Sequence, residues 1–109
     1  MEDEACIAND TIIYNMAMIT IGEKAVVSQG AHLCCGTHDY TDKNFQLYAL
    51  PITIGANAWL CTECFVGPGI TIGTGAVIGA RTVLFKDAEA WVIYAGNPAK
   101  AIKKRIIKN

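Results

Sequence analysis

The sequence predicts an all-β fold in which the chain winds into a coil of short parallel strands. Aliphatic residues recur every six positions, small or β-branched residues follow four positions after them, and glycine often comes directly after the aliphatic residue. An α-helix requires apolar spacings of three and four, and an antiparallel strand requires sustained alternation, so neither fits this period. If three six-residue sides close one turn, residues 18 apart stack and bury an aliphatic ladder between turns.

The pattern begins close to the N-terminus. Ile7 and Ile13 fit the six-residue step, two extra residues intervene, and the first clear run is then Ile21, Val27 and Leu33. Glycine after an aliphatic residue suits a corner at which the backbone bends sharply or leaves the β region. The coil is therefore expected to have inward aliphatic side chains on its sides and glycine at its corners.

The pattern pauses after Leu33, because the aliphatic residue due at position 39 arrives fifteen residues late, as Ile54. The intervening stretch, about residues 39–53, reads DYTDKNFQLYALPIT and is polar, aromatic and interrupted by proline. We expect it to leave the coil as an excursion loop. Regular scaffolds carry function on such loops, so the residues around this loop are the first candidates for chemistry.

The second run keeps step without a break through Ile54, Leu60, Val66, Ile72, Ile78 and Leu84. The small or β-branched inward residues of the two runs are Ala25, Ala31, Thr37, Ala58, Cys64, Ile70, Ala76 and Thr82. Cys64 is thus expected to be a buried small hydrophobe. The coil should cover about residues 7–89 in about five to six turns, within one domain of residues 1–109.

A short C-terminal helix is expected over about residues 98–108. Pro98 would take the first helical position, where proline is favoured, with Asn97 before it. Ala99, Ile102 and Ile106 would then share one face and turn the neighbouring basic residues toward solvent.

Composition excludes several classes of protein. No apolar run approaches the roughly 18 residues that cross a bilayer, and Glu2, Asp3 and Glu4 have the wrong sign for a signal peptide. We expect a cytoplasmic protein that does not bind membranes.

The net charge is −1 and no wide basic field is present, which argues against nucleic acid as a partner. Five of the nine basic residues lie in the last ten positions, so a local anion site is possible.

The five cysteines indicate a reducing compartment more than a disulfide framework. Cys61 and Cys64 form a C-x-x-C pair, but a zinc site of that kind needs a second ligand pair at suitable spacing. No metal is expected.

Five segments carry a resemblance that covers about residues 7–105: IYNMAMITIG, SQGAHLCCGTHDYTD, PITIGANAW, FVGPGITIGTGAVIGARTV and AGNPAKAIKKR. They resemble the hexapeptide-repeat acyltransferases, and within them the sugar O-acetyltransferases such as maltose and galactoside acetyltransferase, with the colanic acid biosynthesis acetyltransferase group most similar. The resemblance implies a left-handed parallel β-helix, an exception to the usual right-handed crossover. It also implies a homotrimer with active sites between subunits, and acetyl-CoA as the acyl donor.

The resemblance also implies roles for particular residues. His38 matches the general-base histidine, and Trp59 matches a tryptophan beside the acyl-CoA. Cys61, Gly79 and Ala80 correspond to the wall along the pantetheine. The residues that correspond to the region near the CoA phosphates are Arg81, Asn97, Pro98, Lys100, Lys103 and Arg105. Around the loop, Asn15, Asp39, Tyr40, Asp42 and Tyr48 are candidates to line an acceptor site.

Acetyl transfer from a thioester to an alcohol needs a base for the hydroxyl proton, and histidine serves near neutral pH. We therefore predict an O-acetyltransferase acting on a hydroxyl of a sugar or similar small acceptor, with His38 as base and His32 in a structural role. One alternative is a non-catalytic trimeric β-helix scaffold, which would not bind CoA. A zinc carbonic anhydrase of the same fold is a weaker alternative, since it needs three histidine ligands and the chain has two.

Overall fold

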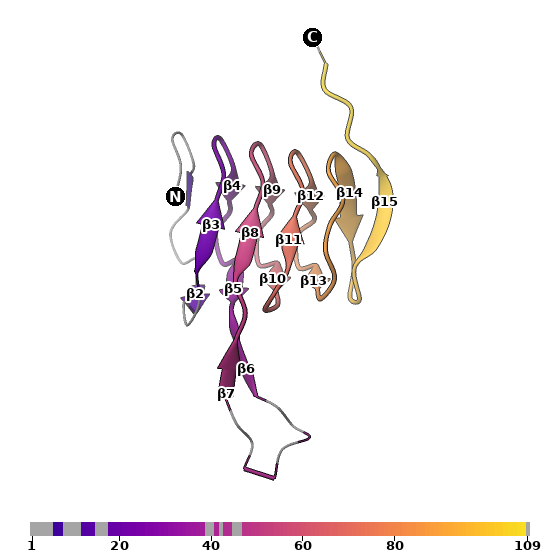
Figure 1. The fold of residues 1–109 in the computed structure, drawn as a ribbon. Helices are drawn as coiled ribbons and strands as arrows, with labels where there is room; N and C mark the ends of the chain where they lie inside the picture. Colours follow the sequence, from indigo (N-terminus) through magenta and orange to yellow (C-terminus); the bar gives the residue numbers. More distant parts are fainter. Residues whose placement is uncertain are drawn as a thin grey trace.

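The structure, a computed structural model, describes residues 6–7, 12–14, 18–38, 41, 43–44 and 47–108. The chain forms the left-handed parallel β-helix that the sequence predicts, with its turns side by side along one axis (Figure 1). The coil runs from β1 (Cys6–Ile7) to β14 (Val92–Ala95), and the molecule measures 54 × 28 × 21 Å.

Three sheets form the sides of the coil. Sheet A contains, in spatial order, β1, β4 (Val26–Val27), β9 (Trp59–Leu60), β12 (Val77–Ile78), β14 and β15 (Lys100–Lys104). Sheet B contains β2 (Ile12–Tyr14), β5 (His32–Cys34), β10 (Phe65–Val66) and β13 (Val83–Leu84). Sheet C contains β3 (Ile19–Ile21), β8 (Ile52–Ile54) and β11 (Thr71–Ile72). Within these sheets the named strands pair in parallel except at β15.

Strand register confirms the predicted stacking. Ile54 pairs with Ile72, 18 residues later, and the same separation joins Leu60 to Ile78 and Val66 to Leu84. The two extra residues near the N-terminus appear as a 20-residue separation between Ile13 and Leu33. The excursion appears as a 33-residue separation between Leu33 and Val66. The six-residue period therefore sets the register on both sides of each interruption.

The core of the coil is a column of inward side chains from all three sheets. The aliphatic ladder from Ile21 to Leu84 is at most 3% exposed, and Cys64 is 1% exposed in the slot that Ala58 and Ala76 occupy elsewhere. Burying one such aliphatic side chain stabilises the fold by about 1.5–3 kcal/mol. Cys64 is the small buried hydrophobe that the sequence predicts.

Glycine at the corners has a different reason from the one that the sequence suggests. At the corner between sheets C and A (the C–A corner), a Cβ on Gly55 would lie 2.5 Å from the backbone nitrogen of Thr74, and one on Gly73 would lie 2.5 Å from that of Ala90. Close approach of the next turn thus requires glycine there. The left-handed backbone comes two residues later, for example at Asn57 (φ 61°).

The excursion leaves the coil as an antiparallel ribbon. β6 (Gly36–His38) pairs with β7 (Leu47–Ala49), so that Gly36 lies opposite Ala49 and His38 opposite Leu47. Figure 1 shows this ribbon projecting from the coil below β5 and β8. The ribbon is tied to the coil at its base, where the Leu50 amide donates to the Cys35 carbonyl over 3.0 Å.

The predicted C-terminal helix is wrong, because this segment forms strand β15. Gly96 has a φ of 99° in the reversal between β14 and β15, and β15 returns antiparallel along β14, with Lys100 opposite Ala95. β14 pairs with β12 along one edge, and its other edge has no further turn of the coil beside it. β15 supplies hydrogen-bond partners for the N–H and C=O groups of that edge. Ile102 is 59% exposed, so the described residues do not cover the apolar face of the expected helix, and a short helix without such packing is marginal.

Candidate functional site

Nine of the residues that the sequence singles out fall in four places on the structure. Trp59 and Arg105 line a pocket beside the C–A corner. Cys61, Gly79, Ala80 and Arg81 lie along the corner between sheets A and B (the A–B corner). Pro98 and Lys100 line a second pocket at the C-terminal end of the coil. His38 lies on the projecting ribbon.

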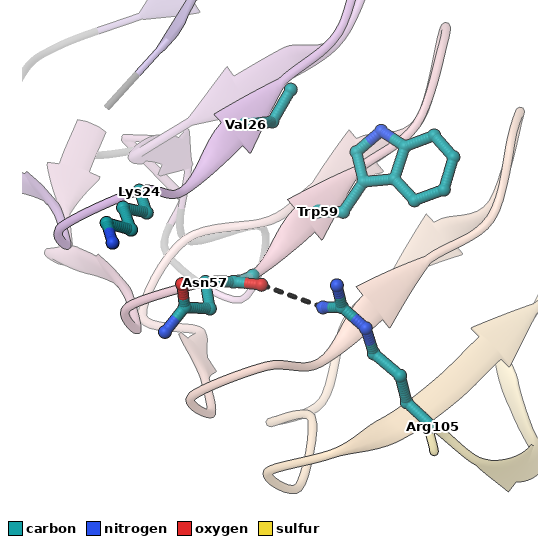
Figure 2. Close-up of a pocket in the computed structure, with 6 residues that line it drawn as sticks. Lys24, Val26, Asn57, Trp59 and Arg105 are labelled. Atoms are coloured by element: carbon teal, nitrogen blue, oxygen red, sulfur yellow. Dashed lines mark hydrogen bonds between the residues drawn. The ribbon is translucent and has the colours of Figure 1, made fainter. Parts of the chain in front are cut away.

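The first pocket has a volume of about 360 Å³ and combines an apolar floor with cationic side chains. Its lining residues are Lys24, Val26, Asn57, Ala58, Trp59 and Arg105. The Trp59 side chain is 46% exposed, and its indole nitrogen donates to Ser28 Oγ over 3.0 Å. Figure 2 shows the Arg105 side chain pointing toward Asn57, with a dashed line for its hydrogen bond to the Asn57 carbonyl oxygen.

Arg105 is held firmly in this pocket. Its Nη1 donates to the carbonyl oxygens of Asn57 (2.8 Å) and Gly75 (3.1 Å), and its backbone amide donates to the Trp91 carbonyl (2.7 Å). The guanidinium carbon also lies 5.7 Å from the centre of the Trp91 ring. The structure therefore brings Arg105 to the C–A corner and not to the end pocket that Lys100 lines.

The A–B corner offers a surface of mostly small residues. The amide of Cys61 donates to the Ile78 carbonyl and that of Gly79 to the Tyr94 carbonyl, each over 2.8 Å, which stacks these positions in successive turns. Arg81 follows with a left-handed backbone (φ 60°) and an exposed side chain whose Nη2 lies 3.5 Å from Glu63 Oε1. A linear ligand could run along this corner parallel to the coil axis.

The end pocket has a volume of about 400 Å³ and lies at the C-terminal end of the coil. Its lining residues are Leu84, Phe85, Lys86, Asp87, Tyr94, Pro98, Ala99 and Lys100. The Asp87 carboxylate is engaged, because its Oδ1 accepts from the Thr71 amide over 2.8 Å, and the Tyr94 hydroxyl accepts from the Glu89 amide over 2.8 Å. Lys86 and Lys100 thus place two ammonium groups beside an aromatic and aliphatic lining. Lys103 lies outside this pocket on β15, opposite Ile93.

The two histidines occupy different settings. The backbone of His38 is placed by its pairing with Leu47 in the ribbon. His32 lies on the outer side of sheet B, with its ring edge-on to Phe65 at a centroid distance of 5.1 Å. The acceptor-site candidates Asn15, Asp39, Tyr40 and Asp42 lie outside the described residues.

Sequence reasoning missed several pocket residues. Lys24 and Asn57 are corner residues with positive φ, and Lys86 follows the last inward aliphatic residue of the repeat. The repeat pattern assigns all three to solvent, and no local motif distinguishes them from other corner residues. Only the stacking of turns brings Lys24 and Asn57 together with Arg105.

Burial controls the cysteine chemistry at the A–B corner. Burial raises the pKa of the Cys61 thiol, and burial together with the neighbouring Cys61 raises the pKa of Cys64 from 9.0 to about 12. Both thiols are therefore neutral near pH 7 and are poor nucleophiles and metal ligands in that state. The four cysteines at positions 34, 35, 61 and 64 are free thiols.

Among the described residues, no three side chains of His, Cys, Asp or Glu gather in a way that could hold a metal ion. The same part of the chain contains no helix of sufficient length and apolar character to span a membrane.

Comparison with known proteins shows the relatives of this chain. Residues 51–86 match the family model described as bacterial transferase hexapeptide (six repeats). Over 104 residues the chain is 45% identical to WcaF of Escherichia coli, which is named as an acetyltransferase of colanic acid biosynthesis. That alignment covers 95% of this chain and 57% of WcaF, so the chain spans little more than half of its relative.

Solved structures of related proteins have the same fold. A maltose O-acetyltransferase from Clostridium difficile 630 superposes with a TM-score of 0.90 at 29% identity, over 96% of this chain and 58% of that one. A galactoside acetyltransferase in complex with coenzyme A superposes with a TM-score of 0.74 at 25% identity, over 95% of this chain and 60% of that one.

Proposed function

Because the chain belongs to the hexapeptide-repeat acyltransferase family, we propose that it transfers an acetyl group from acetyl-CoA to a hydroxyl of a sugar or similar small acceptor. The observation that carries this proposal is the 45% identity to an acetyltransferase over 95% of the chain, within which His38 falls on the projecting ribbon. The acyl donor is also supported by the galactoside acetyltransferase structure, which contains coenzyme A.

In the proposed reaction His38 acts as a general base. Its imidazole takes the proton of the acceptor hydroxyl while the oxygen attacks the thioester carbonyl of acetyl-CoA. The new C–O bond forms, the C–S bond breaks, and the CoA thiolate leaves and takes up a proton. Direct transfer needs no nucleophile from the protein, which agrees with the neutral, partly or fully buried thiols of Cys61 and Cys64.

Acetyl-CoA is proposed to lie along the A–B corner and to end in the pocket at the C-terminal end of the coil. Gly79, which has no side chain, and Ala80, which has only a methyl group, leave room for a thin chain beside Cys61. The ammonium groups of Lys86 and Lys100 would meet the phosphates, and Phe85 and Pro98 would give an apolar surface to the adenine. Trp59 would flank the acyl end, since its indole bonds Ser28, the residue that stacks on Cys61.

A homotrimer with active sites between subunits is also proposed. Two sides of the coil carry apolar side chains on their outer faces, including Trp59 on sheet A and Phe65 on sheet B. Two further apolar side chains, Phe85 and Ile106, are 62% and 84% exposed. The ribbon that carries His38 projects from its own coil (Figure 1), where it could reach a neighbour. A small chain with a narrow core gains stability by covering such faces.

The test is acetyl-CoA turnover, followed by thiol release, against a panel of mono- and oligosaccharides. Acceptor-dependent thiol release supports the proposal. A scaffold protein would neither bind immobilised CoA nor hydrolyse acetyl-CoA slowly, and that result would contradict it. Light scattering checks the assembly, since a stable monomer at micromolar concentration contradicts both the trimer and the shared site.

A further inference from the structure

The pocket beside the C–A corner shares only Trp59 with the surface proposed for acetyl-CoA, and we propose that it is a binding subsite for a sugar unit that carries a carboxylate or phosphate group. Two cationic side chains, Lys24 and Arg105, line it together with an exposed tryptophan face. This inference goes beyond the proposed acetyl transfer and does not depend on it.

The cationic side of the pocket is organised before any ligand arrives. One guanidinium nitrogen of Arg105 is fixed by the Asn57 and Gly75 carbonyls, and the Trp91 ring supports the group from another side. Nη2 and Nε of Arg105 make no hydrogen bond among the described residues, and the only described ion pair involving an arginine joins Arg81 to Glu63. A guanidinium presents its donors as a planar fork that suits a carboxylate or phosphate, and a fixed fork loses little freedom on binding.

The apolar side of the pocket suits a sugar ring. Val26 and Trp59 are neighbours on adjacent strands β4 and β9, and their side chains are 38% and 46% exposed. Ala58 adds a small side chain that leaves the floor open. The C–H faces of a pyranose pack on such a surface, while the Asn57 side chain at the rim can bond hydroxyl groups. A simple inorganic anion would use the cations and leave this floor uncovered.

The cationic side chains of the pocket lie apart from the other candidate sites. Its cations sit at the C–A corner, whereas Lys86 and Lys100 lie at the end of the coil and Gly79 lies at the A–B corner. Trp59 stands between the two regions, with its indole nitrogen on the Ser28 side. An anionic sugar at Lys24 and Arg105 should therefore bind without displacing CoA.

The experiment follows the two indole N–H signals of ¹⁵N-labelled protein by NMR, without acetyl-CoA, and a Trp91→Phe variant assigns them. The probes are methyl β-D-glucuronide, glucose 6-phosphate and the neutral methyl β-D-glucoside. We expect at least one anionic probe to shift the Trp59 signal saturably, with an affinity at least about tenfold above that of the neutral probe. Equal affinities for all three, or no saturable shift, would overturn the proposal.

Charge variants test the assignment to these side chains. Lys24→Gln and Arg105→Gln should each weaken the anionic probe about fivefold or more, while Arg81→Gln, an exposed arginine outside the pocket, should leave it unchanged. If Arg105→Gln disturbs β15, Lys24→Gln still decides the question. Displacement of the sugar by CoA, or an equal loss of affinity in Arg81→Gln, would contradict the proposal.

Turnover with a neutral acceptor should be unchanged in Lys24→Gln, so that loss of this subsite and failure of acetyl transfer remain distinguishable.

Discussion

Arg105 Nη1 donates a hydrogen bond to the carbonyl oxygen of Asn57 over 2.8 Å, across 48 residues of sequence. The same nitrogen donates to Gly75, which stacks on Asn57 at the C–A corner. Both acceptor residues have positive φ. One side chain from the end of the chain thus ties two successive corners of the coil together, and it fixes β15 against the sheet.

Replacing Arg105 with alanine should lower the free energy of unfolding by about 1–3 kcal/mol, because two hydrogen bonds to a charged donor are lost. Thermal or urea unfolding measures this difference. Arg81→Ala is the matched control, since its exposed pair with Glu63 should contribute at most about 1 kcal/mol. Equal losses in the two variants would show that the corner hydrogen bonds of Arg105 add nothing to stability.

Gly55→Ala should destabilise the coil by at least about 2 kcal/mol, because the added Cβ would press on the backbone of Thr74, which cannot move without shifting a turn. Gly79→Ala is the control. Its Cβ would lie 3.1 Å from the Tyr94 carbonyl oxygen, so a smaller shift accommodates it. Melting temperatures of the two variants decide the matter, and a drop for Gly79→Ala as large as that for Gly55→Ala would contradict the close-approach explanation.

Thr82→Val should stabilise the protein by about 1 kcal/mol. Thr82 is fully buried, and its hydroxyl oxygen has no hydrogen-bond partner among the described residues. Replacing an unpaired buried hydroxyl with a methyl group of similar size removes a desolvation cost. Thr53→Val, at an exposed position of sheet C, should change stability little. Loss of stability in Thr82→Val would indicate that the hydroxyl makes a hydrogen bond in solution.

Cys64 should make stability depend on alkaline pH. Its pKa is raised to about 12 in the fold, so above pH 9.0 the unfolded thiol releases a proton that the folded thiol retains. The stabilisation is complete below pH 9.0 and is lost as pH rises toward 12, at up to about 1.4 kcal/mol per pH unit. Urea unfolding at pH 8 to 11 should therefore show a steeper decline for the natural protein than for Cys64→Ala. Parallel curves would contradict this account.

His38→Ala should remove activity and leave the fold intact. A general base typically contributes about 10² to 10⁴ in rate, so kcat should fall by that order while CoA affinity and the melting temperature barely change. His32→Ala is the companion variant, because His32 packs edge-on against Phe65 and is expected to affect stability more than turnover. Near-full turnover in His38→Ala, or inactivity confined to His32→Ala, would show that His38 is not the base.

The sequence by itself determined the coil and its register. The period of six is a local property, and each aliphatic residue such as Leu60 can reach the core only if residues 18 apart, here Ile78, stack upon it. The late return at Ile54 likewise predicted that a segment leaves the coil, because the register on both sides fits no other arrangement. An aliphatic residue that recurs every six positions can be buried at each repeat only in a coil of stacked turns. This part of the fold therefore follows from the sequence alone.

Tertiary structure decided what the ends and corners do. The spacing of Ala99, Ile102 and Ile106 suits a helix, yet the open backbone edge of β14 binds this segment as a strand, and no sequence pattern reports a vacant edge. Gly55 is required by the backbone of the next turn and not by its own φ. Lys24, Asn57 and Arg105 meet only because the turns stack at the spacing of β-strands, which brings corner residues and the returning chain end into one pocket.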